Sequence, residues 1–424
     1  MTFAVVLFIV ALALIASEKV HRTKVALGAA ALAILFISGF DQETAIEAID
    51  FNTIGLLAGM MLLVHLTQES GVYDYIAIKA GQFSKGRPFW VVMSLAGTTA
   101  VLSAFLDNLT TILLVVPITF LLADALDIRP IPLIIIEVIA SNIGGTATLI
   151  GDPPNIIIGG ATGLSFNAFL INLGPVVVVT FFAVIPLLYF FFKRQLQVAP
   201  EARDHVMSLS ARDAINDWSE LKRTVPVLGL TVVGFFLHNV LHIEVATVAL
   251  TGAAVALIVT RQDLEYSLSK IEWPTLFFFM ALFIMVGSLE EVGAIDKIAE
   301  GMKEVTQGNR SAELLGILVV SGIGSGLVDN IPFTATMLPI VEQLNPGSDP
   351  IGDEAYWWAL ALGACFGGNA TAIAAAANVA ALGLTERAGK PISFLQFTKV
   401  GLPVSLVTLV IAAGYVTLRY IWLQ

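Results

Sequence analysis

The sequence predicts an all-α polytopic membrane protein, and three observations lead to this prediction. Of the 424 residues, 57% are hydrophobic and only 13% are charged, whereas a soluble domain carries about 25% charged residues. The apolar runs last about 15 to 22 residues and do not alternate in period two, which favours helices over a membrane β-barrel. Similar segments also recur along the chain at a nearly constant offset, which indicates an internal repeat.

The apolar runs define the elements of the first half. In order, these are spans near 2–16, 25–40 and 51–67, an amphipathic segment at 68–87, an apolar stretch at 88–121 with a polar break, an interrupted segment at 131–160, and a last span at 167–192. The first run lacks the basic start and the cleavage site of a signal peptide, so we expect it to remain as a span.

The stretch at 88–121 is predicted to form a re-entrant hairpin with its tip at Asp107–Asn108. It offers about 34 residues, whereas two full crossings of a bilayer need roughly 40. A hairpin that enters and leaves on one side fits this length better. Each half then contributes five crossings and one hairpin, which gives about ten transmembrane helices, two hairpins and two broken helices.

The repeat is visible in three pairs of segments. QESGVYDYIA at 68–77 matches EEVGAIDKIA at 290–299, and Asp107–Asn108 matches Asp329–Asn330, both at an offset of 222 residues. NIGGTAT at 142–148 matches CFGGNAT at 365–371, at an offset of 223 residues.

These matches predict a first repeat at 1–192, a connecting loop at 193–222, and a second repeat at 223–424 with its hairpin near 312–341. Because five crossings is an odd number, the second repeat must lie upside down relative to the first. Such inverted repeats are typical of secondary transporters.

Basic residues predict the orientation. If Met1 is outside, all 22 lysines and arginines fall on the inner side except Lys297, Lys303, Arg310 and Arg419. The outer segments at 41–50 and 342–354 are acidic, which agrees. We therefore expect a multi-pass protein of the cytoplasmic (inner) membrane with both termini outside, a first hairpin that opens to the cytoplasm and a second that opens outward.

The four polar breaks are the candidate binding sites, because irregular backbone at membrane depth occurs only where it faces protein or a water-filled cavity. Helix ends there present free N–H and C=O groups to ions or polar solutes. Glycine pairs are also common where helices pack closely, and threonines can bond to their own backbone. The candidate substrate- or ion-binding residues are Asp107, Asn108, Thr110, Thr111, Asn142, Gly144, Gly145, Thr146, Thr148, Asp152, Asn155, Ser325, Asp329, Asn330, Thr334, Gly367, Gly368, Asn369, Thr371 and Asn378.

Three carboxyl groups are candidates for proton coupling, because a charge in the membrane is costly and is usually functional. They are Asp107 and Asp329 at the hairpin tips, which could also cap the second hairpin arms, and Glu137, which could instead be a packing acid paired with Arg129. Asp152 has no acidic counterpart in the second half and stands at the N-cap position before Pro153 and Pro154.

Other chemistries find no support in the sequence. Cys365 is the only cysteine and the five histidines are scattered, so we expect no resident metal and no cofactor. There is no phosphate-binding loop of the GxxxxGK[ST] kind, no nucleophile elbow, no HExxH and no nucleic-acid footprint. The chain is therefore predicted not to be an enzyme.

The segment SNIGGTATLIGDPPNIIIGG at 141–160, with the LDN and VDN tips, resembles the arsenite permease and P-protein branch of the ion transporter superfamily, over nearly the whole chain. The resemblance implies export of arsenite or antimonite, alone or with a soluble ATPase subunit. Sodium–proton antiporters and sodium-coupled dicarboxylate carriers belong to the same superfamily. The dicarboxylate carriers have Ser-Asn-Thr at both tips, whereas the aspartates here would repel a carboxylate substrate.

We therefore expect a transporter in the lipid bilayer that exports the neutral trihydroxide As(OH)3 or Sb(OH)3 in exchange for protons. A neutral solute suits the asparagines and threonines of the breaks, and one cysteine leaves no tight thiolate trap. The alternative is a Na⁺/H⁺ antiporter. A third interpretation is a channel or a passive membrane subunit, with the 193–222 loop as the docking surface for a cytoplasmic partner.

Overall fold

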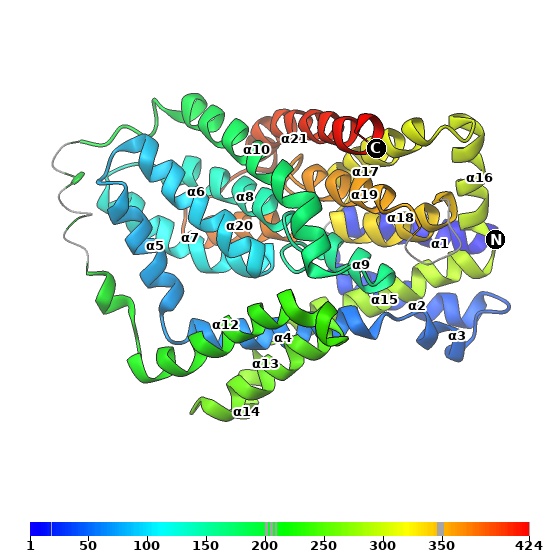
Figure 1. Cartoon of the computed structure of the whole chain (residues 1–424), viewed down its shortest axis with the longest axis horizontal. Helices are drawn as coiled ribbons and strands as arrows, with labels where there is room; N and C mark the ends of the chain where they lie inside the picture. The colour runs from blue at the N-terminus through cyan, green and yellow to red at the C-terminus, as the bar shows by residue number, and fades with distance from the viewer. Residues whose placement is uncertain (18, 200–201, 204–206, 208–209, 346–351, 424) are drawn as a thin grey trace.

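The computed structural model describes residues 1–17, 19–199, 202–203, 207, 210–345 and 352–423, and Figure 1 shows that their fold is built from helices. Eight helices are long and apolar enough to cross a membrane, and three shorter apolar helices accompany them. The predicted all-α polytopic class is confirmed. Parts of the expected 193–222 loop and of the acidic 342–354 segment lie outside the described residues.

The first half contains ten α-helices, of which α8 and α9 form the predicted interrupted segment. They are α1 (Thr2–Ala16), α2 (Arg22–Phe36), α3 (Gln42–Glu47), α4 (Phe51–Gln68), α5 (Val72–Phe83), α6 (Pro88–Phe105), α7 (Asn108–Ala125), α8 (Pro130–Gly145), α9 (Pro153–Thr162) and α10 (Phe166–Phe192).

The second half follows the same order, and α19 and α20 form its interrupted segment. Its helices are η1 (Ala211–Ala214), α12 (Trp218–Leu241), α13 (Val245–Val259), α14 (Leu264–Ser269), α15 (Trp273–Glu291), α16 (Ala294–Thr306), α17 (Arg310–Leu327), α18 (Asn330–Leu344), α19 (Glu354–Gly367), α20 (Ala376–Arg387), α21 (Phe394–Val416) and η2 (Thr417–Trp422).

The hairpin arms are longer than the sequence predicts. Helices α6 and α7 have 18 residues each, so the first hairpin reaches Ala125 rather than residue 121. Their length and composition would allow each to cross a membrane alone. The re-entrant path therefore stays a prediction. The polar tip is where expected, because Leu106 and Asp107 adopt extended backbone between the two helices.

The helices form two groups, which Figure 1 shows as a lower and an upper layer. The lower layer pairs α4 with α13 and α2 with α15, so that each pair joins the two halves of the chain. In the upper layer, α6 packs on α8 and α17 packs on α19. Helix α9 contacts α4 of the lower layer and both α18 and α19 of the upper layer. This piece of the first broken helix therefore lies where the two groups meet, whereas α20 packs on α7 and α8.

Glycine allows the broken helices to approach the hairpin arms. A Cβ atom on Gly144 of α8 would lie 2.2 Å from the carbonyl oxygen of Ala100 on α6. A Cβ on Gly367 of α19 would lie 2.4 Å from the carbonyl oxygen of Gly322 on α17. Neither position has room for a side chain, so at least one glycine of each pair serves close packing of helices.

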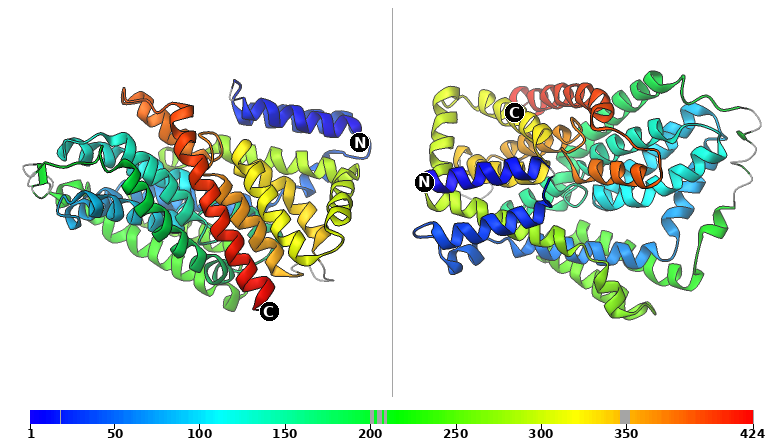
Figure 2. Two further views of the ribbon diagram at one scale, coloured as in Figure 1. Left: turned by 90° about the horizontal axis from the view of Figure 1, so that it is seen from above. Right: turned by 180° about the vertical axis from the view of Figure 1, so that it is seen from behind.

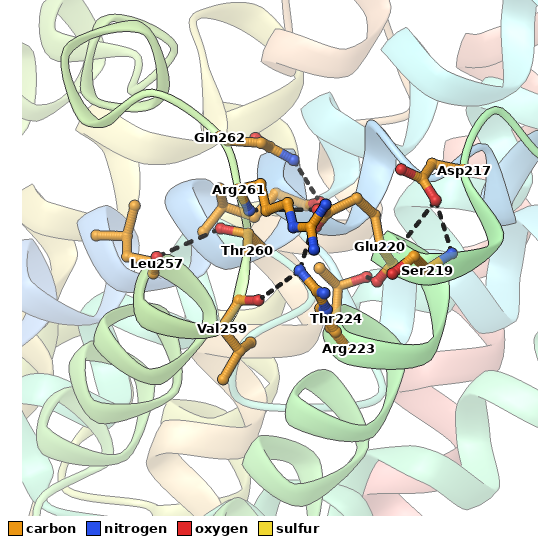
Figure 3. Close-up of polar contacts among 11 residues, drawn as sticks. Asp217, Ser219, Glu220, Arg223, Thr224, Leu257, Val259, Thr260, Arg261 and Gln262 are labelled. Atoms are coloured by element: carbon orange, nitrogen blue, oxygen red, sulfur yellow. Dashed lines mark hydrogen bonds and ion pairs between the residues drawn. The ribbon is translucent and has the colours of Figure 1, made fainter.

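Polar contacts join the start of α12 to the end of α13 beside the connecting region, as Figure 3 shows. Arg223 Nη1 lies 3.6 Å from Glu220 Oε1 and donates to the carbonyl oxygen of Val259 at 3.3 Å. The backbone N–H of Arg261 donates to Glu220 Oε1 at 3.2 Å. These bonds tie the α13–α14 connection to the first turn of α12, where the second half begins.

The turn between α1 and α2 does not lie at an end of the molecule. Both views in Figure 2 place it nearer the middle of the long dimension, with the N-terminus at one extremity. Each of these helices has only 15 residues, or about 22 Å at 1.5 Å per residue. Arg22, which the sequence places in the inner loop between the first two spans, begins α2 and lies beside the tip of the second hairpin.

Candidate functional site

The hairpin tips are fixed by aspartate caps. Asp107 Oδ1 accepts the backbone N–H of Thr110 at 2.8 Å, and Asp107 Oδ2 accepts the Thr110 hydroxyl at 2.5 Å. Asp329 Oδ1 accepts the backbone N–H of Ile331 at 2.9 Å. A side-chain oxygen at this position satisfies an N–H group that the helix itself leaves open. The expected capping role is confirmed at both tips.

Asp152 does not cap its helix, contrary to the expectation. Its backbone precedes α9, but its side chain makes no capping bond among the described residues. Pro153 and Pro154 have no N–H, and the N–H of Asn155 donates to the backbone carbonyl oxygen of Asp152 at 3.0 Å instead. Asp152 Oδ1 instead accepts amide N–H groups from Asn108 at 3.1 Å and from Asn330 at 3.0 Å. The side chain is fully buried. One carboxyl group thus joins the tips of both hairpins.

A second set of amide bonds joins the two broken helices. The Asn142 side-chain amide of α8 donates to Asn369 Oδ1 at 3.2 Å and to Asn378 Oδ1 at 3.0 Å. Asn108 Nδ2 also donates to Asn142 Oδ1 at 3.3 Å. All of these side chains are buried. The amides, with Asp152, therefore form one connected polar centre that involves all four breaks.

Two further amides hold the unwound backbone. Asn155 Nδ2 donates to the carbonyl oxygens of Thr146 at 3.0 Å and Thr148 at 2.8 Å. Asn378 Nδ2 donates in the same way to the carbonyl oxygens of Gly368 and Thr371, both at 2.8 Å. Carbonyl groups freed where a helix breaks need such partners away from water. These asparagines stabilise the breaks.

Several contacts recur at the offset of the sequence repeat. The hydroxyl of Ser103 donates to the carbonyl oxygen of Ser141 at 2.8 Å, and that of Ser325 donates to the carbonyl oxygen of Ala364 at 2.6 Å.

The threonines of the breaks make backbone bonds as well. Thr148 donates to the Ala104 carbonyl oxygen, and its counterpart Thr371 donates to the Gly326 carbonyl oxygen at 2.9 Å. Thr146 and Thr334 bond to carbonyl oxygens of their own helices at 2.7 Å. These four hydroxyl groups therefore serve packing and helix geometry in this conformation.

Four polar atoms of the centre are buried and have no hydrogen-bond partner. They are Asn108 Oδ1, Thr111 Oγ1, Asp152 Oδ2 and Asn369 Nδ2. Buried polar atoms without partners are rare and costly, and they often mark a position that a ligand, an ion or a water fills. Three of the four accept hydrogen bonds and one donates. Gly145 and Gly368 lie in the same breaks, at the ends of α8 and α19.

Glu137 is buried in the middle of α8, away from this centre. Both of its carboxyl oxygens lie within hydrogen-bond distance of the Thr119 hydroxyl of α7, at 2.6 and 2.7 Å. The expected alternative pairing with Arg129 is wrong, because no ion pair joins the two within the described part of the chain. Arg129 instead precedes α8, two turns away.

Two residues of the site were missed in the sequence. Arg22 Nη1 lies 3.2 Å from Asp329 Oδ2, and the Arg22 guanidinium lies 5.1 Å from the ring centroid of Phe278. Cys365, the repeat counterpart of Asn142, places its sulfur 3.6 Å from Asn155 Oδ1. An arginine at the start of an apolar helix was a visible signal. The cysteine gave none beyond its position in the repeat.

A cavity of about 440 Å³ leads to the tip of the second hairpin. It is bordered by the α1–α2 turn with His21 and Arg22, by Leu109 of the first tip, by Asp329, and by the first turns of α20. The cavity is partly open, so solvent can reach the Arg22–Asp329 pair from the side of this turn.

Comparisons with known proteins agree with a transporter. The family model described as "Citrate transporter" matches residues 12–363. The chain is 43% identical over 423 residues to an uncharacterized transporter of Mycobacterium tuberculosis, covering 98% of each chain. It is 34% identical over 494 residues to the P protein of Homo sapiens, covering 96% of this chain and 59% of that protein. The solved YdaH transporter of Alcanivorax borkumensis aligns with a TM-score of 0.62 at 16% identity, covering 95% of this chain and 99% of that one, and supports the fold alone.

Proposed function

The chain belongs to the citrate transporter family, and from this premise we propose that it exports a small neutral trihydroxide, As(OH)3 or Sb(OH)3, in exchange for protons. The cargo site would be the polar centre around Asp152 and the amides of Asn108, Asn142, Asn330 and Asn369. Membership of a transporter family and several helices long enough to cross a membrane support the general activity. The cargo and the coupling rest on the chemistry of the centre.

The proposal rests on the buried polar atoms of the centre that have no hydrogen-bond partner among the described residues. As(OH)3 has three O–H donors and oxygens that accept hydrogen bonds. Asn108 Oδ1, Thr111 Oγ1 and Asp152 Oδ2 are three buried acceptors without partners, and Asn369 Nδ2 is a buried donor without one. A solute that satisfies these atoms recovers the cost of leaving them unpaired. Cys365 is the only thiol of the chain, so the site cannot trap such a cargo with several thiolates and can release it.

A carboxylate cargo fits the centre poorly, although the family is described as citrate transporters. Asp152 is fully buried there, and Asp107 caps the neighbouring tip. The nearest basic group is Arg22, which Asp329 already engages. A citrate anion would meet uncompensated negative charge, which disfavours binding. We therefore expect no citrate transport.

Protons are proposed to move through Asp107 and Glu137. Neither has an ion-pair partner among the described residues; Glu137 is buried and Asp107 is half-buried, and binding a proton would remove a charge that has no partner in the protein. Asp329 was a third candidate, but its contact with Arg22 supports a permanent charge there instead. Exchange with protons matters because a neutral solute gains nothing from the membrane potential, whereas a proton does.

The same three oxygen atoms favour a second candidate, exchange of Na⁺ for protons. A small cation is bound by carboxylate, amide and hydroxyl oxygens, and Asp152 would supply its counter-charge. The unpartnered N–H of Asn369 argues against this candidate, because it needs a hydrogen-bond acceptor and a cation supplies none. The experiment below separates the two.

The decisive experiment measures arsenite uptake into everted vesicles from a bacterial host that lacks its own metalloid exporters. We expect uptake that requires an imposed proton gradient and stops with an uncoupler. Asp152→Asn should abolish it, whereas Asp41→Asn, an exposed helix cap far along the chain, should not. Arsenite uptake that ignores the uncoupler would refute the coupling. Sodium-dependent proton movement without arsenite uptake would establish the second candidate instead.

We propose an inner-membrane location with both termini outside, and two inverted repeats at 1–192 and 223–424. The serine and threonine contacts that recur at the repeat offset support a common fold for the halves. The distribution of basic residues supports the orientation. A soluble ATPase subunit, if one assists, would dock on the 193–222 connection. Accessibility of cysteines introduced near Met1 and near Lys222 to an impermeant reagent tests the sidedness.

A further inference from the structure

An apolar groove lies between α10 and α21, the two long helices that Figure 1 shows along the upper edge of the molecule. Its volume is about 320 Å³. The lining is apolar except for one lysine, and comprises Val184, Leu187, Leu188, Phe190, Phe191, Lys399, Val400, Pro403, Val404 and Val407. None of these residues belongs to the polar centre, and the groove serves no part of the proposed transport cycle.

Proline explains why two packed helices leave such a gap. Pro186 lies inside α10 and Pro403 lies inside α21, where it also borders the groove. A proline inside a helix removes a backbone hydrogen bond and bends the helix. Both helices continue through these prolines but each lacks one backbone hydrogen bond near the groove, where α10 nears its end and α21 nears its start.

The groove faces away from the protein. Leu187 is 53% exposed, Phe190 59% and Phe191 67%. In a chain of this class, such side chains on a long apolar helix face the lipid hydrocarbon. An elongated apolar ligand can therefore enter the groove sideways from the bilayer.

Basic groups lie at one end of the groove. Lys399 borders it directly, in the second turn of α21. The ammonium of Lys193, which follows α10, lies 6.0 Å from the ring centroid of Phe190, another residue of the lining. Two positive charges at the mouth of an apolar groove complement a negative headgroup with a hydrocarbon tail.

We propose that this groove binds an anionic phospholipid, with an acyl chain between α10 and α21 and its phosphate at Lys193 and Lys399. Both lysines belong to the side that the charge distribution assigns to the cytoplasm, so the lipid would come from the inner leaflet. The proposal is independent of the cargo. It gives α10 and α21, one from each half, a shared ligand that bridges the two repeats.

The test compares lipid retention by the purified full chain in native mass spectrometry, with phosphatidylglycerol and phosphatidylcholine as probes. We expect phosphatidylglycerol to bind preferentially. Lys193→Gln/Lys399→Gln should weaken its binding about thirty-fold, because each lysine near a headgroup contributes about a factor of five. The control Lys222→Gln/Lys297→Gln removes two exposed lysines elsewhere and should leave binding unchanged.

A groove variant separates the acyl chain from general charge effects. Val404→Trp should fill the groove and reduce phosphatidylglycerol binding while the chain stays folded, as judged by its elution and its unfolding temperature. Equal binding of both lipids, or unchanged binding in the Lys193/Lys399 variant, would overturn the proposal. So would a concentration-dependent dimer that Val404→Trp abolishes, because a second copy would then be the occupant.

Discussion

The ion pair between Arg22 and Asp329 permits a quantitative test of how the second hairpin is held. We consider Arg22→Gln, Asp329→Asn and the double variant. Gln and Asn keep the size of each side chain, and the Asn oxygen can still accept the backbone N–H of Ile331 that Asp329 accepts now. The variants therefore remove charge and leave the helix cap in place.

The expected size follows from the geometry. At the 3.2 Å between Arg22 Nη1 and Asp329 Oδ2, the attraction is about 5 kcal/mol with an effective dielectric constant of about 20. Desolvation offsets much of it, since the side chains are only 23% and 8% exposed. Arg22→Gln leaves the Asp329 carboxylate, the less exposed of the two charges, without a partner. It should lower the free energy of unfolding by about 2 kcal/mol, less than the 3–5 kcal/mol lost when a fully buried pair is broken. The two single variants and the double variant form a double-mutant cycle. It should give a coupling free energy between Arg22 and Asp329 of about 1–2 kcal/mol.

The assay is reversible unfolding of the purified protein in detergent or bicelles, followed by tryptophan fluorescence. We expect the double variant to be more stable than Arg22→Gln, because the stranded carboxylate is gone. The same ordering is expected for transport in vesicles, if the pair also positions the tip. A coupling free energy within about 0.3 kcal/mol of zero would refute the reasoning, since independent sites add within that error.

Three further predictions concern packing and the buried acid. Gly144→Ala should abolish the yield of folded protein in size-exclusion chromatography, because its Cβ would lie 2.2 Å from the Ala100 carbonyl oxygen, whereas Gly229→Ala, where nothing lies within 4 Å, should not. Glu137→Gln should keep that yield, since Gln is neutral and of equal size, but should uncouple arsenite uptake from the proton gradient; wild-type coupling in this variant would exclude Glu137 from the proton path. Thr119→Val removes the hydrogen-bond donor of Glu137 and should lower the free energy of unfolding by about 1–3 kcal/mol, and this loss should shrink in the Glu137→Gln background.

Local signals predicted the elements of this fold well. Apolar runs located the helices, and the aspartate before each hairpin arm placed the tips, because a cap acts within three residues. Glycines marked both breaks, at 145–153 and 367–376, and prolines marked the first, because these residues also act on the backbone locally. The first hairpin was predicted to end at residue 121, but α7 continues to Ala125. No cap or proline marks the end of this helix in the sequence.

Side-chain partners far apart in sequence were not predictable in the same way. Arg22 and Asp329 are 307 residues apart, so the position of Arg22 at the start of an apolar helix could mark the arginine but could not identify its partner. The error at Asp152 has a different cause, because the sequence contained the answer. Two prolines leave only the N–H of Asn155 for a side-chain cap, so the sequence already favoured capping less at Asp152 than at Asp107, and the N–H of Asn155 bonds to the Asp152 backbone instead.

The two halves share many repeated contacts, but they differ in which charged side chains contact the hairpin tips. Asn108 and Asn330 are repeat counterparts, yet both donate to Asp152, which the second half replaces with Ala375. Conversely, among the described residues only the second tip engages an arginine. If the two halves were identical, each would contribute the same groups to the cargo site. Here, the Asp152 carboxyl group accepts hydrogen bonds from the asparagines of both tips. Movement of either hairpin away from Asp152 would therefore break one of these bonds. This shared contact would couple the two gates through a single residue, and it explains why the unshared GDPP belongs at the centre of the site.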